Sequence, residues 1–443
     1  MLRKTKIICT LGPATEDEAV LRRLMLGGMN AARFNFSHCT HEDAAKKLEA
    51  VTRLREELGL PIATILDTKG PEIRVKTFQN GPVQLRAGDT FTLTTREVEG
   101  DEKMVSITYQ DLTKDLKAGA RVLIDDGLVE LRAEEVTDTD IVCTVINGGQ
   151  VSNHKGINVP GTQLSMPFIS EQDRADIIFG IEHGFDYIAA SFTRSAKDIL
   201  AIRSILKEYD CHSINIIAKI ENQEGVDNID EILEAADGIM IARGDLGIEV
   251  AQELIPGIQR RLVDKAIRAH KPVIVATQML QSMIHNPRPT RTEVTDIANA
   301  VYSRADALML SGETAYGDYP EEAVKVMATV AWQAEKDLFK EFGGVDIPLS
   351  DNPDVTEFFS KEAVMATKRM KLRAIIMDSY TGRTARYVSS FRGQCTILAI
   401  CYKAKTVRHL ALSYGVYAIY MPMKSYGHEF LLAALRKLLS DNM

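Results

Sequence analysis

Two clusters of charged residues near the middle of the chain each follow a run of aliphatic residues. The first lies in INIIAKIENQEG (214–225) and the second in GIMIARGDLGIE (238–249). Together they present Lys219, Glu221, Arg243 and Asp245. One carboxylate from each of two strands is how Mg²⁺ is usually held, because the ion keeps part of its water and takes further oxygens from a substrate. A lysine two residues from one carboxylate would add a positive charge beside the ion.

The aliphatic runs predict the elements that position these charges. Unbroken apolar runs of this length are typical of parallel strands that are covered on both faces. The charged residues would then lie at the carboxyl ends of the strands, where α/β enzymes place their chemistry. Ordinary solvated charges would explain one such strand end, but two of the same design favour a functional site.

The composition sets the class of protein. With 443 residues the chain is long enough for two or three domains, and 45% hydrophobic with 26% charged residues is usual for a globular protein. A net charge of -8 argues against general binding of nucleic acid or anionic membranes. Six cysteines without a CxxC pair predict reduced thiols and a cytoplasmic protein. No apolar run has the length of a membrane span, and the one near the N-terminus is too short for a secretion signal.

The order of predicted elements indicates three parts. Residues 1–70 read β-α-β-α-β, with Thr15 as the expected cap of a helix over about 16–27, and the alternation resumes over 170–341. The eight βα units together predict a (β/α)₈ barrel. Residues 71–169 show short alternating segments and a hairpin signal at Asp126-Gly127, which predict an inserted all-β lid domain. Residues 342–443 predict a C-terminal α/β domain with an open sheet.

The other barrel strands are also expected to end in polar groups. These are Arg33, Asn35, Ser37 and His38 after the second strand, Asp67, Thr68, Glu72 and Arg74 after the third, Thr277 and Gln278 after the seventh, and Ser311, Gly312 and Glu313 after the eighth. A mouth rich in both cations and carboxylates suits a phosphorylated acid held with a divalent metal, since the cations take the phosphate and the carboxylates hold the ion.

Three features have simpler readings. Ser37 and Thr68 could merely cap helices. His38, Cys39 and His41 resemble a metal cluster, but their spacing fits no zinc pattern. The stretch SYTGRTAR could be a plain capped turn or an anion site at a helix start. The residues that would form that anion site are Ser379, Thr381, Gly382, Arg383 and Thr384.

Nine ordered stretches of the chain closely resemble the pyruvate kinase family. They are KTKIICTLGPAT, ARFNFSH, ILDTKGPEIR, NHKGINVPG, AKIENQEG, ARGDLGIE, ATQMLQSM, NPRPTRTEV and LMLSGETAYGDYP. They span almost the whole barrel and the borders of the insertion, so a chance match is negligible. The resemblance implies the same three-part layout. It also implies transfer of the phosphoryl group of phosphoenolpyruvate to ADP, giving pyruvate and ATP in the last step of glycolysis.

The resemblance also implies a role for each matching residue. Glu221 and Asp245 would bind Mg²⁺ or Mn²⁺, Lys219 would neutralise the phosphoryl group in flight and the enolate, and Arg33 would hold the substrate phosphate. The remaining assignments follow the same motifs: Gly244 and Thr277 at the substrate carboxylate, Arg74 and Lys155 at the nucleotide phosphates, and Asn35, Ser37, Asp67 and Thr68 around K⁺. Glu72 stands where other members carry lysine, which implies dependence on K⁺. The proton donor to the enolate is open, with Thr277, and Ser311 through water, as candidates.

The chain departs from the family at its C-terminal end. Members have further strands after the last helix that help to enclose a sugar-phosphate effector, whereas this sequence ends at LRKLLSDNM. A truncated sequence, a missing tail or a protein without those strands would each explain this. Regulation by a sugar phosphate or AMP is therefore open, and a homotetramer is implied by the resemblance alone. Two other function classes remain: a metal-dependent mutase or lyase on a barrel, and a relative that binds without catalysis.

Overall fold

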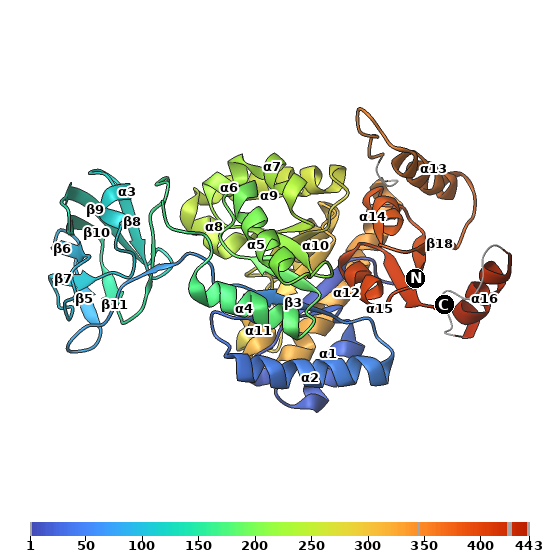
Figure 1. Ribbon diagram of the computed structural model, residues 1–443, viewed down its shortest axis with the longest axis horizontal. Coiled ribbons are helices and arrows are strands. Elements are labelled where there is room, and N and C mark those ends of the chain that lie inside the picture. The colour runs from blue at the N-terminus through green and yellow to red at the C-terminus, as the bar shows by residue number, and fades with distance from the viewer. Residues whose placement is uncertain (1, 343–345, 423–427, 441–443) are drawn as a thin grey trace.

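The structure is a computed structural model, and it describes residues 2–342, 346–422 and 428–440. Figure 1 shows three bodies in a row, with an all-β body at one end, a barrel with its helices in the middle and a second α/β body at the other end. Among the described residues, no helix combines the length and the apolar character needed to cross a bilayer.

The central body is a closed barrel of eight parallel strands, which confirms the predicted (β/α)₈ fold. Its strands follow one another around the barrel in the order β1-β17-β16-β15-β14-β13-β3-β2. Their bounds are β1 Lys6–Thr10, β2 Ala31–Asn35, β3 Ala63–Asp67, β13 Tyr187–Ala190, β14 Asn215–Ile220, β15 Gly238–Ala242, β16 Val273–Ala276 and β17 Ala307–Leu310. Their aliphatic side chains are buried on both faces, inside the barrel and under the helices, which explains the unbroken apolar runs.

Helices cover the outside of the barrel. They are α1 Glu18–Gly27, α2 His41–Leu58, α4 Glu171–Glu182, α5 Ala196–Glu208, α6 Gln223–Asp227, α7 Ile229–Ala235, α8 Arg243–Glu249, α9 Ile255–Arg268, α10 Arg291–Tyr302, α11 Gly312–Ala315 and α12 Pro320–Phe342. Short 3₁₀ turns lie at η1 Pro13–Thr15, η2 Gln252–Leu254 and η3 Gln281–Ile284.

The expected cap of the first helix was wrong. The Asp17 carboxylate accepts from the Ala19 N–H at 2.8 Å, so Asp17 is the N-cap of α1. The Thr15 hydroxyl instead bonds to the backbone of Gly12 and closes η1. Thr15 is the last residue of the 3₁₀ turn η1, which leaves Asp17, two positions later, as the cap of the helix.

The inserted body is all-β apart from one short helix, α3 Leu112–Asp115, which the sequence did not predict. Seven strands form one sheet in the order β4-β12-β8-β9-β10-β6-β7, and β5 and β11 pair separately. Their bounds are β4 Ile73–Arg74, β5 Val83–Leu85, β6 Thr90–Thr94, β7 Met104–Ser106, β8 Arg121–Ile124, β9 Val129–Val136, β10 Asp140–Asn147, β11 Gly149–Val151 and β12 Gly156–Asn158. The body has its own apolar core, and β8 and β9 form the predicted hairpin, with positive φ angles at Asp125, Asp126 and Gly127.

The C-terminal body has a parallel sheet in the order β18-β19-β20, covered by helices. Its elements are α13 Val355–Arg369, β18 Ala374–Ser379, α14 Arg383–Ser390, β19 Thr396–Cys401, α15 Ala404–His409, η4 Leu410–Leu412, β20 Val416–Tyr420 and α16 His428–Ser440. Buried ion pairs join this body to the barrel: Arg392 with Asp306 at 2.6 Å, and Arg408 with Asp186 at 2.8 Å. The residue numbers at which the three domains meet stay a prediction.

Candidate active site

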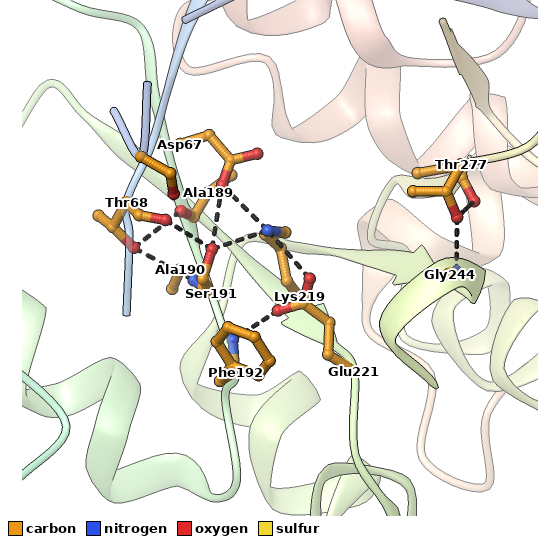
Figure 2. A network of polar contacts seen from close by, with 12 residues as sticks. Asp67, Thr68, Ala189, Ala190, Ser191, Phe192, Lys219, Glu221, Gly244 and Thr277 are labelled. Atoms are coloured by element: carbon orange, nitrogen blue, oxygen red, sulfur yellow. Dashed lines mark hydrogen bonds and ion pairs between the residues drawn. The ribbon is translucent and has the colours of Figure 1, made fainter. Parts of the chain in front are cut away.

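The Lys219 ammonium lies at the centre of a buried polar network at the carboxyl end of β14 (Figure 2). Its Nζ is 3.0 Å from Glu221 Oε1, 3.1 Å from Asp67 Oδ1 and 2.7 Å from the Ser191 hydroxyl, to which it donates. Burial lowers the pKa of Lys219, but Asp67 and Glu221 more than offset it and raise the pKa above its ordinary value. Lys219 therefore carries a fixed positive charge in a site from which water is largely excluded.

Glu221 is almost completely buried, with 1% of its surface exposed. Its Oε2 accepts a hydrogen bond from the Phe192 N–H at 2.6 Å. Burial raises the pKa of Glu221, Lys219 opposes that rise, and the negative charge of Asp245 adds to it. A divalent cation bound by Glu221 and Asp245 would relieve this repulsion, so the donor set fits Mg²⁺ or Mn²⁺.

Asp245 reaches the same region from the neighbouring strand. β14 and β15 pair in parallel, with Ile220 opposite Ile241, and Asp245 lies in the first turn of α8 directly after β15. The preceding Gly244 N–H donates to the Thr277 hydroxyl at 2.7 Å, as Figure 2 shows. The structure thus brings Glu221, Gly244, Asp245 and Thr277 to one end of the barrel.

Thr277 adopts a backbone conformation that is rare for a β-branched residue. Its φ is +68°, and that of the next residue, Gln278, is +55°. The hydroxyl accepts from Gly244 and donates to the Ala276 carbonyl at 2.6 Å. Such strain persists only where the surroundings enforce it, and it is common at active sites.

Arg33 and Asp67 form a buried pair beside Lys219. Arg33 Nε donates to Asp67 Oδ2 at 2.5 Å, and its Nη1 donates to the Thr10 hydroxyl at 3.0 Å. Burial alone would raise the pKa of Asp67, but Arg33 and Lys219 together lower it. Asp67 therefore stays ionised and holds both cations at the mouth of the barrel.

The four oxygen-bearing residues expected around K⁺ lie at or just beyond the ends of two neighbouring strands, β2 and β3. Asn35 and Asp67 are register partners at the ends of β2 and β3. Asn35 Oδ1 accepts from the Ser37 N–H at 3.2 Å, and the Thr68 hydroxyl lies 3.3 Å from the Ala189 carbonyl. Carboxylate, amide and hydroxyl oxygens each have lone pairs for a second partner, so the set fits a monovalent cation.

A cavity of about 660 Å³ separates the lid from the barrel mouth. Arg74 and Lys155 line it from the lid, and Asp245 lines it from the barrel. Arg74 is paired with Glu72 at 2.7 Å and Lys155 with Asp125 at 2.7 Å. Arg74 also donates to the His154 carbonyl at 2.7 Å, so both cations are fixed on the wall of the cavity that Asp245 shares.

Two charged groups that were expected at the mouth are engaged elsewhere. The Arg243 guanidinium pairs with Asp296 of α10 at 2.7 Å and donates to the Thr277 carbonyl at 2.8 Å. Glu313 accepts from the Leu280 N–H at 3.0 Å and so ties together the loops after β16 and β17. Both side chains therefore bond to neighbouring segments and do not point into the mouth. The sequence could not predict this, because neither spacing nor residue type fixes the direction of a side chain beyond a strand end.

Of the two histidines, His38 lines the cavity between the lid and the barrel, whereas His41 is bonded elsewhere. His41 Nε2 is 2.7 Å from the Asp176 carboxylate of α4. Within the described ranges, no three His, Cys, Asp or Glu side chains gather as metal ligands around it. The Ser311 hydroxyl is buried and has no hydrogen-bond partner among the described residues.

The sequence reasoning missed two groups, Ser191 and the N–H of Phe192. Ser191 Oγ accepts from Lys219 and lies 2.6 Å from the Thr68 carbonyl, while Phe192 N–H bonds Glu221. Both follow β13 directly, so the rule that polar groups matter at strand ends could have found Ser191. A backbone N–H has no sequence signal, and Phe192 could not have been identified in this way.

The candidate anion loop of the C-terminal body has a compact shape. Gly382 has φ +84°, and its N–H donates to the Ser379 hydroxyl at 3.0 Å. The Arg383 guanidinium pairs with Asp354 and lies over the Tyr387 ring at 5.2 Å. Thr381 Oγ1 accepts a long hydrogen bond from the Arg383 N–H at 3.4 Å. Arg383 and Thr384 are the first two residues of α14. A phosphate would have to compete with Asp354 for Arg383.

Comparison with known proteins decides the family. The family model described as "Pyruvate kinase, barrel domain" matches residues 2–324, and the one described as "Pyruvate kinase, alpha/beta domain" matches residues 357–443. The chain belongs to the pyruvate kinase family. Its members transfer the phosphoryl group of phosphoenolpyruvate to ADP in glycolysis, and the chain is a phosphotransferase of this kind.

Individual relatives support the assignment over nearly the whole chain. It is 45% identical to a pyruvate kinase of Geobacillus stearothermophilus over 97% of this chain and 74% of that protein. It is 44% identical to one of Clostridium acetobutylicum over 94% of this chain and 89% of that protein. A solved pyruvate kinase structure from Cryptosporidium parvum has a TM-score of 0.94 and 38% identity, and the match covers 99% of this chain and 91% of that one.

Proposed function

We propose that this phosphotransferase carries out its reaction at the barrel mouth around Lys219, with phosphoenolpyruvate on the barrel and ADP under the lid. The observation that supports it most is the buried ammonium held between Glu221 and Asp67. A charge fixed in advance in a dry site stabilises developing negative charge without reorganisation at the moment of reaction.

The substrate would be held by groups that surround this ammonium. Arg33 would take the phosphate, because Asp67 and Thr10 already fix its guanidinium. The Gly244 backbone and the Thr277 hydroxyl would receive the carboxylate end. Mg²⁺ or Mn²⁺ bound by Glu221 and Asp245 would supply positive charge for the substrate oxygens.

During transfer, an oxygen of the terminal ADP phosphate attacks the phosphorus while the bond to the enol oxygen breaks. The electron pair of that bond stays on the enol oxygen, and Lys219 would balance the charge on both the phosphoryl group and the enolate. Arg74 and Lys155 would hold the nucleotide phosphates from the lid. Protonation of the enolate carbon then gives pyruvate, with Thr277 and, through water, Ser311 as candidates for the proton path.

The experiment that tests this reaction measures pyruvate formed from phosphoenolpyruvate with and without ADP. We expect equal amounts of pyruvate and ATP, and no pyruvate when ADP is absent. A mutase or lyase would consume phosphoenolpyruvate without ADP, and a binding-only relative would consume none. Either result would contradict the proposal.

We infer that K⁺ assists the reaction, bound by Asn35, Ser37, Asp67 and Thr68. Glu72 supports this inference, because it leaves the site without a lysine at that position, and its carboxylate is occupied by Arg74. Turnover should fall several-fold when K⁺ is replaced by tetramethylammonium at constant ionic strength. Equal turnover in both salts would exclude a role for K⁺.

Three further properties are proposals. We propose a homotetramer on the basis of the family resemblance, and light scattering with size exclusion would test it. Cytoplasmic location agrees with six free cysteines.

A sugar phosphate or AMP would bind at Ser379–Thr384. A titration with either compound should then shift the half-saturation for phosphoenolpyruvate; no shift would leave the loop as a structural turn.

A further inference from the structure

The lid returns to the barrel through residues 162–168, a segment without regular secondary structure that is bonded to both bodies. Arg194 of the barrel and Asp115 of the lid both contact it. The carbonyls of Leu164 and Met166 accept hydrogen bonds from Arg194, whereas the Ser165 N–H between them donates to Asp115. The segment, called here the return segment, is thus clamped between the two bodies.

Arg194 fits the barrel side of the return segment with its planar fork. Its Nη1 donates to the Leu164 carbonyl at 3.0 Å, and both terminal nitrogens lie 3.3 Å from the Met166 carbonyl. Asp198 fixes the arginine from behind, since it accepts from the Arg194 N–H at 2.8 Å and approaches the guanidinium to 3.5 Å. A guanidinium can bridge two carbonyls in a way that an ammonium cannot reproduce.

The lid side is held by Asp115 at the end of α3. Its Oδ2 accepts from the Ser165 N–H at 2.8 Å and from the Tyr109 hydroxyl at 2.7 Å. The Tyr109 hydroxyl also lies 2.9 Å from the Ser165 hydroxyl. These groups belong to the lid and lie outside the site described above.

The loop that carries Arg194 also carries the groups that hold the catalytic candidates. Ser191 accepts from Lys219, and Phe192, whose φ is +55°, donates its N–H to Glu221. Two positions separate Phe192 from Arg194, and Arg194 and Phe192 line the same cavity. A shift of the return segment that moves Arg194 would therefore move the N–H that orients Glu221.

We propose that Arg194 is a positioning residue that couples the placement of the lid to the orientation of Glu221 through the loop 191–195. The inference rests on the proposed role of Glu221 as a metal ligand. Under this proposal Asp115, in α3 of the lid, affects metal binding although it does not contact the metal ligands.

The test measures Mn²⁺ binding by electron paramagnetic resonance, without substrates, in a double-mutant cycle of Arg194→Ala and Asp115→Ala. Groups bonded directly to a ligand typically change metal affinity by about 10–100-fold, so the more remote Arg194→Ala should raise the Mn²⁺ Kd by about 3–10-fold. Asp115→Ala should raise it by about twofold to threefold on its own and by nothing further in the Arg194→Ala background. Arg174→Ala, which removes an exposed pair with Glu208, is the matched control.

The outcomes separate the two proposals. Equal effects of Asp115→Ala in both backgrounds, or an unchanged Kd in Arg194→Ala, would overturn the coupling. Absence of Mn²⁺ binding in the unmodified protein would overturn the proposed metal site and the coupling with it. If Arg194→Ala does not fold, Arg194→Lys keeps the charge beside Asp198 but loses the fork, and it should shift the Kd in the same direction by a smaller factor; no shift would again overturn the coupling.

Discussion

Lys219 is held by three different groups, and this determines what its removal should do. Lys219→Met keeps most of the volume of the side chain but removes the charge between Asp67 and Glu221. Losing one preorganised donor at a developing charge typically lowers turnover by about 100–1,000-fold, and a full charge in a buried site should reach at least the upper value. Steady-state assays of pyruvate formation should show a loss of about 10³-fold in kcat.

The control for this variant is Lys265→Met, which removes a lysine paired with Asp230 on the outside of the barrel. Its turnover should match that of the unmodified protein. Arg33 still pairs with Asp67 in Lys219→Met, so the protein should fold. Retained turnover in a folded Lys219→Met protein would remove the ammonium from the mechanism.

Glu221→Gln tests the metal site without a large change in shape. The amide keeps an oxygen that can accept from Phe192 but carries no charge, so the cation loses one of its two carboxylates. We expect the Mn²⁺ Kd to rise by at least about tenfold, since even the loss of a group that only hydrogen-bonds to a metal ligand reaches that size. Isothermal titration with Mn²⁺ would measure it, and Glu182→Gln on the outer helix α4 serves as the comparison; equal Kd values would place the metal elsewhere.

For single residues, the sequence predicted which residues lie near the site better than it predicted where their side chains point. Lys219 lies in β14 and Glu221 directly follows the last residue of that strand, so alternation continued by one position places them on one face, and the structure agrees. Arg243 and Glu313 were expected at the mouth by the same rule, but they lie in the first turns of α8 and α11, where the helical backbone replaces the alternation. Their partners, Asp296 and the Leu280 N–H, come from segments that only the folded barrel brings close.

At the scale of elements, the start of α4 is tied to the end of β3. The Ser170 hydroxyl and the Asp173 carboxylate form a capping box, and Asp173 Oδ1 also accepts from the Gly70 N–H at 3.0 Å. Gly70 has φ +74°, and a side chain there would meet Ser191 at 2.9 Å, so the chain can leave the barrel for the lid only with glycine at this position. The capping serine was visible in the sequence, whereas the bond to Gly70 needs the folded barrel.

Ser170→Ala should therefore destabilise the protein by about 1 kcal/mol, the usual cost of losing an N-cap hydroxyl. In a barrel of this size that corresponds to a fall of about 2–4 °C in the melting temperature. Differential scanning fluorimetry would measure it. Ser170→Thr keeps the hydroxyl and should stay within about 1 °C of the unmodified protein; an equal fall in both variants would show that the cap contributes nothing.

At the scale of the whole molecule, the contact between the barrel and the C-terminal body was the least predictable feature. The individual βα units have sequence patterns, but the groups between the bodies are scattered along the chain. Asp186 before β13 is completely buried, and it accepts from the Thr64 N–H and pairs with Arg408 and Lys405 of α15. Nothing in the sequence distinguishes this aspartate from an exposed one, because Thr64 lies more than one hundred positions away and Arg408 and Lys405 more than two hundred.

His409, at the end of α15, makes this contact sensitive to pH. Its Nε2 lies 3.1 Å from the Ser213 carbonyl, so that nitrogen must carry a proton and donate it. Burial lowers the pKa of His409 to about 4, Asp186 opposes the decrease, and Lys405 and Arg386 add to it. The imidazole is thus neutral in the folded protein at pH values at which the unfolded chain, with a pKa near 6.5, binds a proton.

Since the unfolded state binds more protons between about pH 6.5 and pH 4, the free energy of unfolding should fall as the pH decreases through that window and should not depend on His409 above it. The full effect of one such histidine is at most about 3 kcal/mol at the lower end. His409→Gln keeps a donor for the Ser213 carbonyl but does not titrate, so urea unfolding should show a smaller loss of stability from pH 7 to pH 4.5 than in the unmodified protein. His212→Gln on the exposed surface is the matched control, and its stability should follow the same pH dependence as that of the unmodified protein. Matching curves for His409→Gln and the unmodified protein would show that the imidazole is not kept neutral between the two bodies.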